Sequence, residues 1–279
     1  MRLHLLGVRG STPAPGAAFA RYGGDTSCIA LAHDGEVPSL VLDAGTGIRN
    51  LGTVLGEQPF RGDLVLGHLH WDHTQGLPFC RAMDHDGAEV RVLLPRQDDG
   101  AEPLDVLRRA MAPPHFPIGP DELRGRWTFE GMDPGGHELG GFAVTAREVP
   151  HKGGRTYGYR LSDGRRSIAY VSDHGPLACG PGPEGWGAYH DTALALAEGV
   201  DLLVHDAQHT AAELAAVAHL GHSAADYAVR LGERAGAKRV VLFHHDPNRT
   251  DDQLDDLVAS FGDAALPVIG AVEGTTLEL

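Results

Sequence analysis

One short segment, residues 68–73 (HLHWDH), places three imidazoles and one carboxylate within six positions. Imidazole suits zinc, and an aspartate beside it suits a hard or borderline divalent cation. The segment follows the apolar run 64–66, so we expect a buried strand that ends in a ligand-bearing loop. His68 and His70 alternate along an extended segment and therefore point to the same side. These four side chains can begin two metal sites but cannot complete both.

The remaining ligands are expected from other strand ends, because apolar runs lead into His or Asp at three further places. These are His151, after a strand at 142–149, Asp173, after a strand at 167–171, and the pair His244 and His245, after a strand at 239–243. Side chains at strand ends on one edge of a sheet can assemble a site from distant parts of a sequence. Any one of these histidines alone would more often be structural, but the set together favours metal ligands.

Composition limits the partners that the chain can have. The 23 basic and 38 acidic residues give a net charge of −15, which disfavours a stable nucleic-acid partner because such binding depends on Lys and Arg contacts to phosphate. Three cysteines without C-x-x-C spacing indicate buried, reduced thiols rather than a disulfide framework. The absence of a long apolar run excludes a membrane span. We therefore expect a cytoplasmic protein.

The elements that must position these ligands are many short strands, followed by most of the helices in the C-terminal half. Strands are expected at 2–6, 28–32, 39–43, 64–67, 90–94, 142–149, 156–161, 167–171, 202–205, 239–243 and 267–269. Helices are expected at 46–55, 103–111, 192–198, 210–218, 223–235 and 251–261, with Ser223 and Thr250 as N-terminal signals for the last two. This order predicts two packed sheets with helices outside, within a single domain that spans residues 1–279.

The same residues resemble the metallo-β-lactamase superfamily, and within it the cyclic-phosphodiesterase-like members of the RNase Z-like branch. The resemblance covers nearly the whole chain and rests on seven further segments: GVRGSTP (7–13), YGGDTSC (22–28), LDAGTG (42–47), PHFP (114–117), HDAQ (205–208), GHS (221–223) and LFHHDP (242–247). It implies an α/β fold of the αββα sandwich type. It also implies two divalent metal ions, with zinc expected and manganese as the alternative.

The resemblance assigns a role to each candidate ligand. His68, His70 and His151 would hold the first metal ion, Asp72, His73 and His244 would hold the second, and Asp173 would bridge the two. His245 is the rival of His244, which we prefer because it directly follows the apolar strand. Asp43 would orient ligands rather than bind metal, although it could also be a turn residue before Gly45.

The reaction implied by the resemblance is attack on a phosphodiester by a hydroxide that bridges the metal ions. His222 would protonate the leaving oxygen, and Asp206 would orient and charge His222. Asp206 is a departure, because the RNase Z pattern has glutamate there. We place His222, Asp206 and Asp72 in the catalytic set. The alternative is that Ser223 caps a helix and that His222 is incidental.

Several other activities of the superfamily are less favoured. His70 stands where flavodiiron proteins have glutamate, and Asp173 is not the cysteine of the antibiotic-degrading enzymes. Lactonase and thioesterase activities remain alternatives but have no evident counterpart of His222. A non-catalytic metal-binding sensor is a further alternative, which would be expected to lack ligands.

The choice between tRNA 3′ processing and a small cyclic phosphodiester depends on chain length. Short-form RNase Z enzymes carry a long tRNA-binding arm between the third metal histidine and the bridging aspartate. Here only 21 residues separate His151 from Asp173, so we favour a cyclic nucleotide or a phosphoribosyl cyclic phosphate over an RNase Z-type RNA substrate. His115 and Phe116 in a proline-rich loop are candidate substrate contacts. The branch commonly forms homodimers, so we expect one here.

Overall fold

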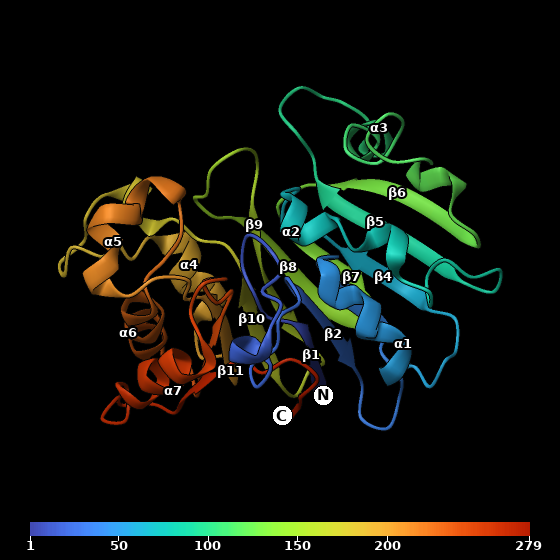
Figure 1. Cartoon of the computed structure of the whole chain (residues 1–279). Helices are drawn as coiled ribbons and strands as arrows, with labels where there is room; N and C mark the ends of the chain where they lie inside the picture. The colour runs from blue at the N-terminus through green and yellow to red at the C-terminus, as the bar shows by residue number, and fades with distance from the viewer.

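Two seven-stranded mixed sheets lie face to face in the computed structural model, which describes all 279 residues (Figure 1). The first sheet has, in spatial order, β14 (Thr276–Glu278), β1 (Arg2–Gly7), β2 (Cys28–Ala32), β3 (Leu40–Leu42), β4 (Arg61–Val65), β5 (Glu89–Pro95) and β6 (Arg126–Met132). The second sheet has β13 (Val268–Gly270), β12 (Val240–Phe243), β11 (Leu202–Asp206), β10 (Ser167–Val171), β9 (Tyr157–Ser162), β8 (Phe142–Glu148) and β7 (Gly135–Leu139).

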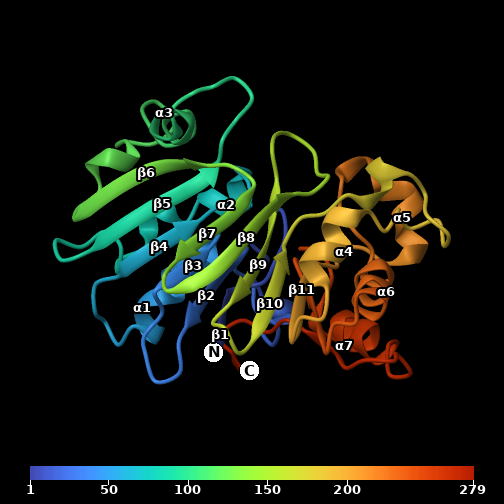
Figure 2. The same cartoon turned by 180° about the vertical axis from the view of Figure 1, so that it is seen from behind.

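Helices cover the outer face of each sheet, as the view from behind also shows (Figure 2). The α-helices are α1 (Leu51–Val54), α2 (Trp71–Thr74), α3 (Pro103–Arg108), α4 (Asp191–Ala197), α5 (Ala211–Val217), α6 (Ala225–Ala235) and α7 (Asp251–Ala259). Short 3₁₀ turns lie at Ala17–Phe19, Thr46–Asn50, Leu77–Phe79, Pro120–Glu122, Pro176–Cys179 and Ala218–Leu220. The expected αββα sandwich is therefore confirmed.

Three apolar layers hold the sandwich together. The central layer joins the inner faces of the two sheets and includes Leu3, Ile29, Tyr159 and Phe243, none of which is measurably exposed. The other two layers pack α1 and α3 on the first sheet and α4–α7 on the second. Side chains alternate between the two faces of a strand, so each sheet can bury one face against its partner sheet and the other against helices.

Each sheet combines antiparallel and parallel pairing in the same order. In the first sheet, β14, β1, β2 and β3 are antiparallel neighbours, and β3 to β6 are parallel. In the second sheet, β7 to β10 are antiparallel and β10 to β13 are parallel. The carboxyl ends of the parallel strands of each sheet lie at one edge, which is where a site can form.

Most of the expected elements are present, and the differences have local causes. Strands β6, β7 and β14 were not predicted: β7 contains two glycines and β14 has only three residues. The helix expected at 46–55 begins as a 3₁₀ turn. The predicted cap at Ser223 is wrong, because α6 begins one residue later with Ala224 at the N-cap. Thr250 caps α7 as predicted, in a capping box with Gln253.

No helix combines the length and the apolar character needed to cross a bilayer. The three cysteines form no disulfide, and Cys28 and Cys80 are buried as expected. Cys179 is exposed, so the expectation of burial fails for that residue, which is the last residue of the 3₁₀ turn Pro176–Cys179.

Candidate metal centre

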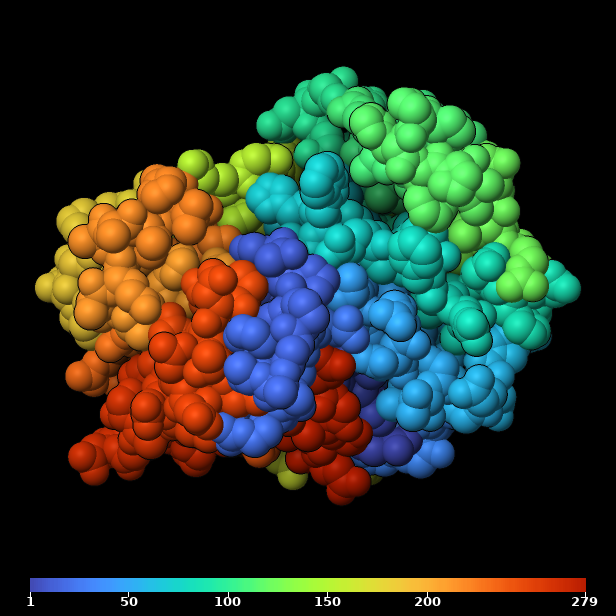
Figure 3. Space-filling view, in the orientation of Figure 1, coloured from blue at the N-terminus to red at the C-terminus, as the bar shows by residue number.

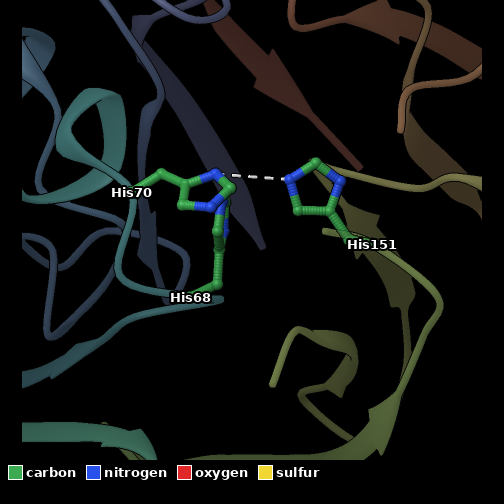
Figure 4. Close-up of side chains that lie close together, drawn as sticks. All are labelled: His68, His70 and His151. Carbon is green, nitrogen blue, oxygen red and sulfur yellow. Dashed lines mark hydrogen bonds between the residues drawn. The ribbon is translucent and has the colours of Figure 1, made fainter. Parts of the chain in front are cut away.

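His68, His70 and His151 form the first group of potential ligands (Figure 4). His68 and His70 lie between β4 and α2, and His151 follows β8. His70 Nδ1 and His151 Nε2 lie 3.3 Å apart. His151 Nδ1 donates a hydrogen bond to the carbonyl oxygen of Gly221 over 2.7 Å, so Nε2 carries the lone pair that faces the group. The arrangement matches the first metal site that the sequence predicts.

Asp72, His73, Asp173 and His244 form the second group, and all four are buried. His244 Nε2 lies 3.2 Å from Asp72 Oδ2 and 3.4 Å from Asp173 Oδ2. His73 Nε2 lies 3.0 Å from Asp173 Oδ1 and 3.3 Å from Asp72 Oδ2. Four potential ligand atoms therefore converge on one point.

Asp173 faces both groups. Its Oδ2 atom lies 3.7 Å from His68 Nε2 and 3.6 Å from His151 Nε2, in addition to its contacts with the second group. The carboxylate follows β10 and is 1% exposed. If both groups held cations, Asp173 would be placed to contact both of them.

The donor set fits divalent metal ions. Both ring nitrogens of His68, Asp173 Oδ1 and His244 Nδ1 are buried without a hydrogen-bond partner. Buried polar atoms normally have partners, because burying them unpaired costs free energy. Lone pairs of nitrogen and oxygen that face one another at about 3–4 Å repel unless a cation lies between them. Imidazoles with carboxylates form the ligand set that zinc and manganese accept.

The electrostatics of the ligands are consistent with this fit. Burial, together with the neighbouring His73, lowers the pKa of His68 well below its usual value, so the ring is neutral and available as a ligand. Burial would also lower the pKa of His73, but the charges of Asp173, Asp72 and Asp43 outweigh it and raise that pKa. A cation bound at Nε2 would take the place of the proton that these carboxylates attract.

Asp43 holds His73 in place rather than facing the two groups. Its Oδ2 atom accepts hydrogen bonds from His73 Nδ1 over 2.9 Å and from the Tyr170 hydroxyl over 2.7 Å. Its Oδ1 atom accepts one from the backbone N–H of Gly67 over 2.7 Å. These bonds fix the His73 tautomer and leave Nε2 for a metal ion.

Glycines in the segments GVRGSTP (7–13) and LDAGTG (42–47) let the backbone lie close to the proposed metal ligands. A Cβ atom at Gly10 would lie 2.4 Å from His244 Nδ1, and one at Gly45 would lie 2.2 Å from the Asp72 carbonyl oxygen. His244 itself has a φ of +58°, a conformation that costs free energy in a non-glycine residue. The position of the His244 ring therefore depends on its own backbone conformation and on the lack of a side chain at Gly10.

His222 lies next to both groups and is tied to Asp206. His222 Nδ1 donates to Asp206 Oδ2 over 3.0 Å, and Asp206 also accepts from the backbone N–H groups of His174 and Gln208. Burial would lower the pKa of His222, but the charges of Asp206, Asp173 and Asp72 raise it to about 9. The ring is therefore protonated near neutral pH in the metal-free protein.

A cavity of about 380 Å³ connects the two ligand groups with His222. It is lined by Ser11, Leu69, His70, Trp71, Asp72, Asp173 and His222. Its volume suits a small molecule such as a cyclic phosphodiester.

The remaining candidates fall into two classes. His245, the rival ligand, bonds through Nε2 to the Ala271 carbonyl oxygen over 2.9 Å and takes no part in either group. His115 is exposed, and Phe116 is half-buried with its ring edge-to-face against Phe79 at 5.8 Å. Both line a larger groove beside the site rather than the small cavity.

Two supporting residues were not predicted from the sequence. The backbone N–H of Ser11 donates to Asp72 Oδ2 over 2.7 Å, and Tyr170 holds Asp43. Ser11 lies in the GVRGSTP segment, which marked the region without revealing a backbone donor. Tyr170 lies in β10, three residues before Asp173. An apolar residue at that position would give the same strand pattern, so the pattern does not indicate its contact with Asp43.

Comparison with known proteins agrees with this geometry. Residues 39–245 match the family model described as the beta-lactamase superfamily domain. A Ribonuclease Z from Natronomonas pharaonis is 25% identical over 97% of this chain and 96% of that protein.

Two solved structures share the fold over nearly their full length. The metallo-beta-lactamase fold protein YhfI from Bacillus subtilis has a TM-score of 0.73 and 18% identity, covering 99% of each chain. A diphosphatase from the PhnP family has a TM-score of 0.69 and 21% identity, covering 100% of this chain and 97% of that one.

Proposed function

This chain belongs to the beta-lactamase superfamily and is RNase Z-like, and from that premise we propose that it is a dinuclear-metal phosphodiesterase acting on a small cyclic phosphodiester. The coarser statement, a metal-dependent hydrolase of the metallo-β-lactamase fold, follows from the family match and the two ligand groups. One observation supports the finer proposal: a hydrogen-bonded His222–Asp206 pair lies against both groups. Hydrolysis of a poor alkoxide leaving group needs such an acid.

Two metal ions, held by the two groups and shared by Asp173, would lower the pKa of a water molecule and neutralise charge on the phosphate oxygens. The rest of the chemistry belongs to side chains. Asp43 holds His73, the Ser11 N–H holds Asp72, and Gly221 holds His151, so the ligands are oriented before substrate binds. The cavity beside them is lined mostly by polar residues, with Leu69 and Trp71 as its apolar members.

His222 supplies the proton. A water molecule gives up one proton to solvent and its oxygen joins phosphorus, while the bond from phosphorus to the leaving oxygen breaks and that oxygen takes the proton of His222. His222 then regains a proton from solvent. Asp206 then stabilises the ring in the orientation needed for the next cycle, since its Oδ2 atom remains bonded to Nδ1. A cyclic substrate yields one product that carries both the phosphomonoester and the new hydroxyl.

The family name alone would also admit β-lactam, lactone, thioester and RNA substrates. Thioester hydrolysis releases a weakly basic thiolate and has little need of the proposed acid at His222. A lactone releases an alkoxide and a β-lactam an amine, so the substrate panel must separate these two classes from a phosphodiester. The 380 Å³ cavity and the net charge of −15 favour a small anion over a folded RNA.

The test is a substrate panel with zinc-loaded protein. It comprises 2′,3′- and 3′,5′-cyclic nucleotides, phosphoribosyl cyclic phosphate, bis(p-nitrophenyl) phosphate, nitrocefin, a lactone and a thioester. We expect turnover of bis(p-nitrophenyl) phosphate and at least one cyclic phosphodiester, with none of nitrocefin. Turnover of nitrocefin, the lactone or the thioester, with none on any phosphodiester, would overturn the proposal.

A further inference from the structure

A groove of about 1710 Å³ opens directly beside the proposed metal centre. Its lining shares Leu69 and Trp71 with the small cavity, so the two spaces are continuous. The groove runs from α2 toward α3, and the space-filling view shows a hollow between these cyan and green parts (Figure 3). The groove is more than four times as large as the small cavity, which leaves room for much more than the reacting phosphate.

One wall of the groove is aromatic and open to solvent. Trp71 is 75% exposed and Phe79 is 56% exposed, and the Phe116 ring packs edge-to-face against Phe79. Trp71 lies between His70 and Asp72 in the sequence, so its position is tied to the proposed ligands. Exposed aromatic side chains grouped in a concave surface indicate a binding site. Their flat faces suit a nucleobase.

The lining of the same groove includes four arginines, Arg49, Arg81, Arg109 and Arg155, and three acidic residues, Glu57, Asp98 and Asp99. Arg109 pairs with Asp99 over 2.8 Å, and Arg155 pairs with Asp98 over 2.9 Å. Arg49 and Arg81, which also line the groove, make no ion pair or hydrogen bond. Free guanidinium groups in a chain with a net charge of −15 favour an anionic ligand, and their geometry suits phosphate.

We infer that the groove binds a nucleobase on one arm of the phosphodiester substrate, and that Arg49 and Arg81 bind a second phosphate on that arm. The inference rests on the proposed function and narrows its substrate class to a nucleotide-bearing phosphodiester instead of a sugar phosphate alone. The small cavity receives the reacting phosphate, and the groove receives the base and the next phosphate. A second copy of the chain on the aromatic wall fits less well, because it would bury two unpaired guanidinium groups.

Three esters with the same p-nitrophenolate leaving group separate the contribution of the base from that of the second phosphate. Methyl p-nitrophenyl phosphate has no base, thymidine 5′-(p-nitrophenyl phosphate) adds the base, and its 3′-phosphorylated form adds the second phosphate. The measured quantity is the ratio of kcat/KM for each thymidine ester to that of the methyl ester. Stacking of one base corresponds to about a tenfold to hundredfold gain.

With zinc-loaded protein we expect both ratios to exceed about ten. Trp71→Ala and Phe79→Ala should lower the thymidine ratio by about tenfold. Arg49→Gln with Arg81→Gln should remove only the additional gain from the 3′-phosphate. Leu220→Ala, exposed outside the groove, and Arg147→Gln, an exposed arginine without a partner, are the matched controls and should leave both ratios unchanged.

A binding measurement gives a readout besides activity. Thymidine 3′,5′-bisphosphate should quench tryptophan fluorescence in the metal-free protein, and Trp71→Phe should remove that quenching. Ratios near one in the unmodified protein, or ratios unchanged in both aromatic variants, would overturn the inference while leaving the proposed function intact. Aromatic variants that convert a dimer to a monomer in sedimentation, with unchanged ratios, would instead show that a second copy covers the groove. Hydrolysis of none of the three esters would contradict the proposed function itself.

Discussion

The hydrogen bond between His222 and Asp206 is the feature on which the proposed phosphodiesterase activity depends. His222 is 9% exposed and Asp206 is fully buried, so the charge of the pair is little screened by solvent. The same pair also lies within reach of Asp173, with 3.8 Å between His222 Nδ1 and Asp173 Oδ2. The role of His222 as acid or as ligand can therefore be separated by experiment.

His222→Ala should retain both metal ions and lose activity selectively. We expect a loss of about 10²–10⁴-fold on a cyclic nucleotide, because its alkoxide leaving group needs the proton. The loss on bis(p-nitrophenyl) phosphate should be much smaller, since p-nitrophenolate is a weak base. Steady-state kinetics and elemental analysis check this. Equal losses on both substrates would indicate positioning, and loss of a metal ion would make His222 a ligand.

The proposed role of His222 as an acid also predicts how kcat/KM depends on pH. Only protonated His222 donates, so kcat/KM on a cyclic nucleotide should fall as the pH rises through its pKa. The surrounding carboxylates raise that pKa to about 9 without metal, and bound cations lower it by repulsion. We expect the limb between about 6.5, the ordinary histidine value, and about 9. An identical limb in His222→Gln would assign it to another group.

Much of the candidate site could be predicted at the residue level, because its ligands follow strands in recognisable patterns. His68, His70 and Asp173 each stand where an apolar strand ends. Their partners are harder to predict, since the Ser11 N–H reaches Asp72 only through tertiary packing. Nearly every residue has a backbone N–H group, so the residue type at position 11 does not predict this hydrogen bond.

At the level of elements, the loop after β1 positions His244. Gly10 lies against the His244 ring, and a Cβ atom there would lie 2.4 Å from Nδ1 and 2.5 Å from Cε1. The backbone of His244 has a φ of +58°, which restricts how far its ring could move away from position 10. A side chain at position 10 would therefore require the His244 ring or the loop to shift.

Gly10→Ala should displace His244 and lower the occupancy of the second metal site, with about tenfold or greater loss of activity. Elemental analysis after dialysis against buffer without metal measures the occupancy. Gly136→Ala in β7 is the matched control, because a Cβ atom there meets nothing within 4 Å. Full occupancy in Gly10→Ala would show that the ring can shift without losing the ion.

The elements that were missed or misplaced have separate local causes. Strand β7 reads GGHEL and is largely exposed, so it lacks the apolar alternation on which prediction depends. The start of α6 was misplaced because Ser223 had the residue type of a cap, whereas its hydroxyl bonds to the Ala224 carbonyl oxygen instead. Strands buried on both faces, such as β2 and β12, were predicted closely.

At the level of the whole molecule, each half of the chain builds most of one sheet, with the C-terminal β14 added to the first, and the two sheets have the same order of pairings. Asp43 follows β3 and Asp173 follows β10, the strands at which each sheet changes from antiparallel to parallel pairing. The two aspartates therefore occupy related places, one behind the ligands and one between them. This correspondence could not be read from the sequence, because the two halves show no repeated motif.

The architecture also argues against tRNA processing. The 21 residues between His151 and Asp173 form β9, β10 and their connections, leaving no segment for an extended arm. We expect no site-specific cleavage of a pre-tRNA at physiological salt by zinc-loaded protein. Gel analysis of a labelled transcript checks this, and efficient cleavage at the mature 3′ end would place the chain with the RNA-processing enzymes.

The central claim, a phosphodiesterase that needs two metal ions per chain, is tested most directly by titrating metal-free protein with zinc while following hydrolysis of bis(p-nitrophenyl) phosphate. Because Asp173 faces both ligand groups, we predict that activity rises until two equivalents per chain are bound and then stays constant. Full activity at one equivalent, or no hydrolysis with two bound, would contradict the account.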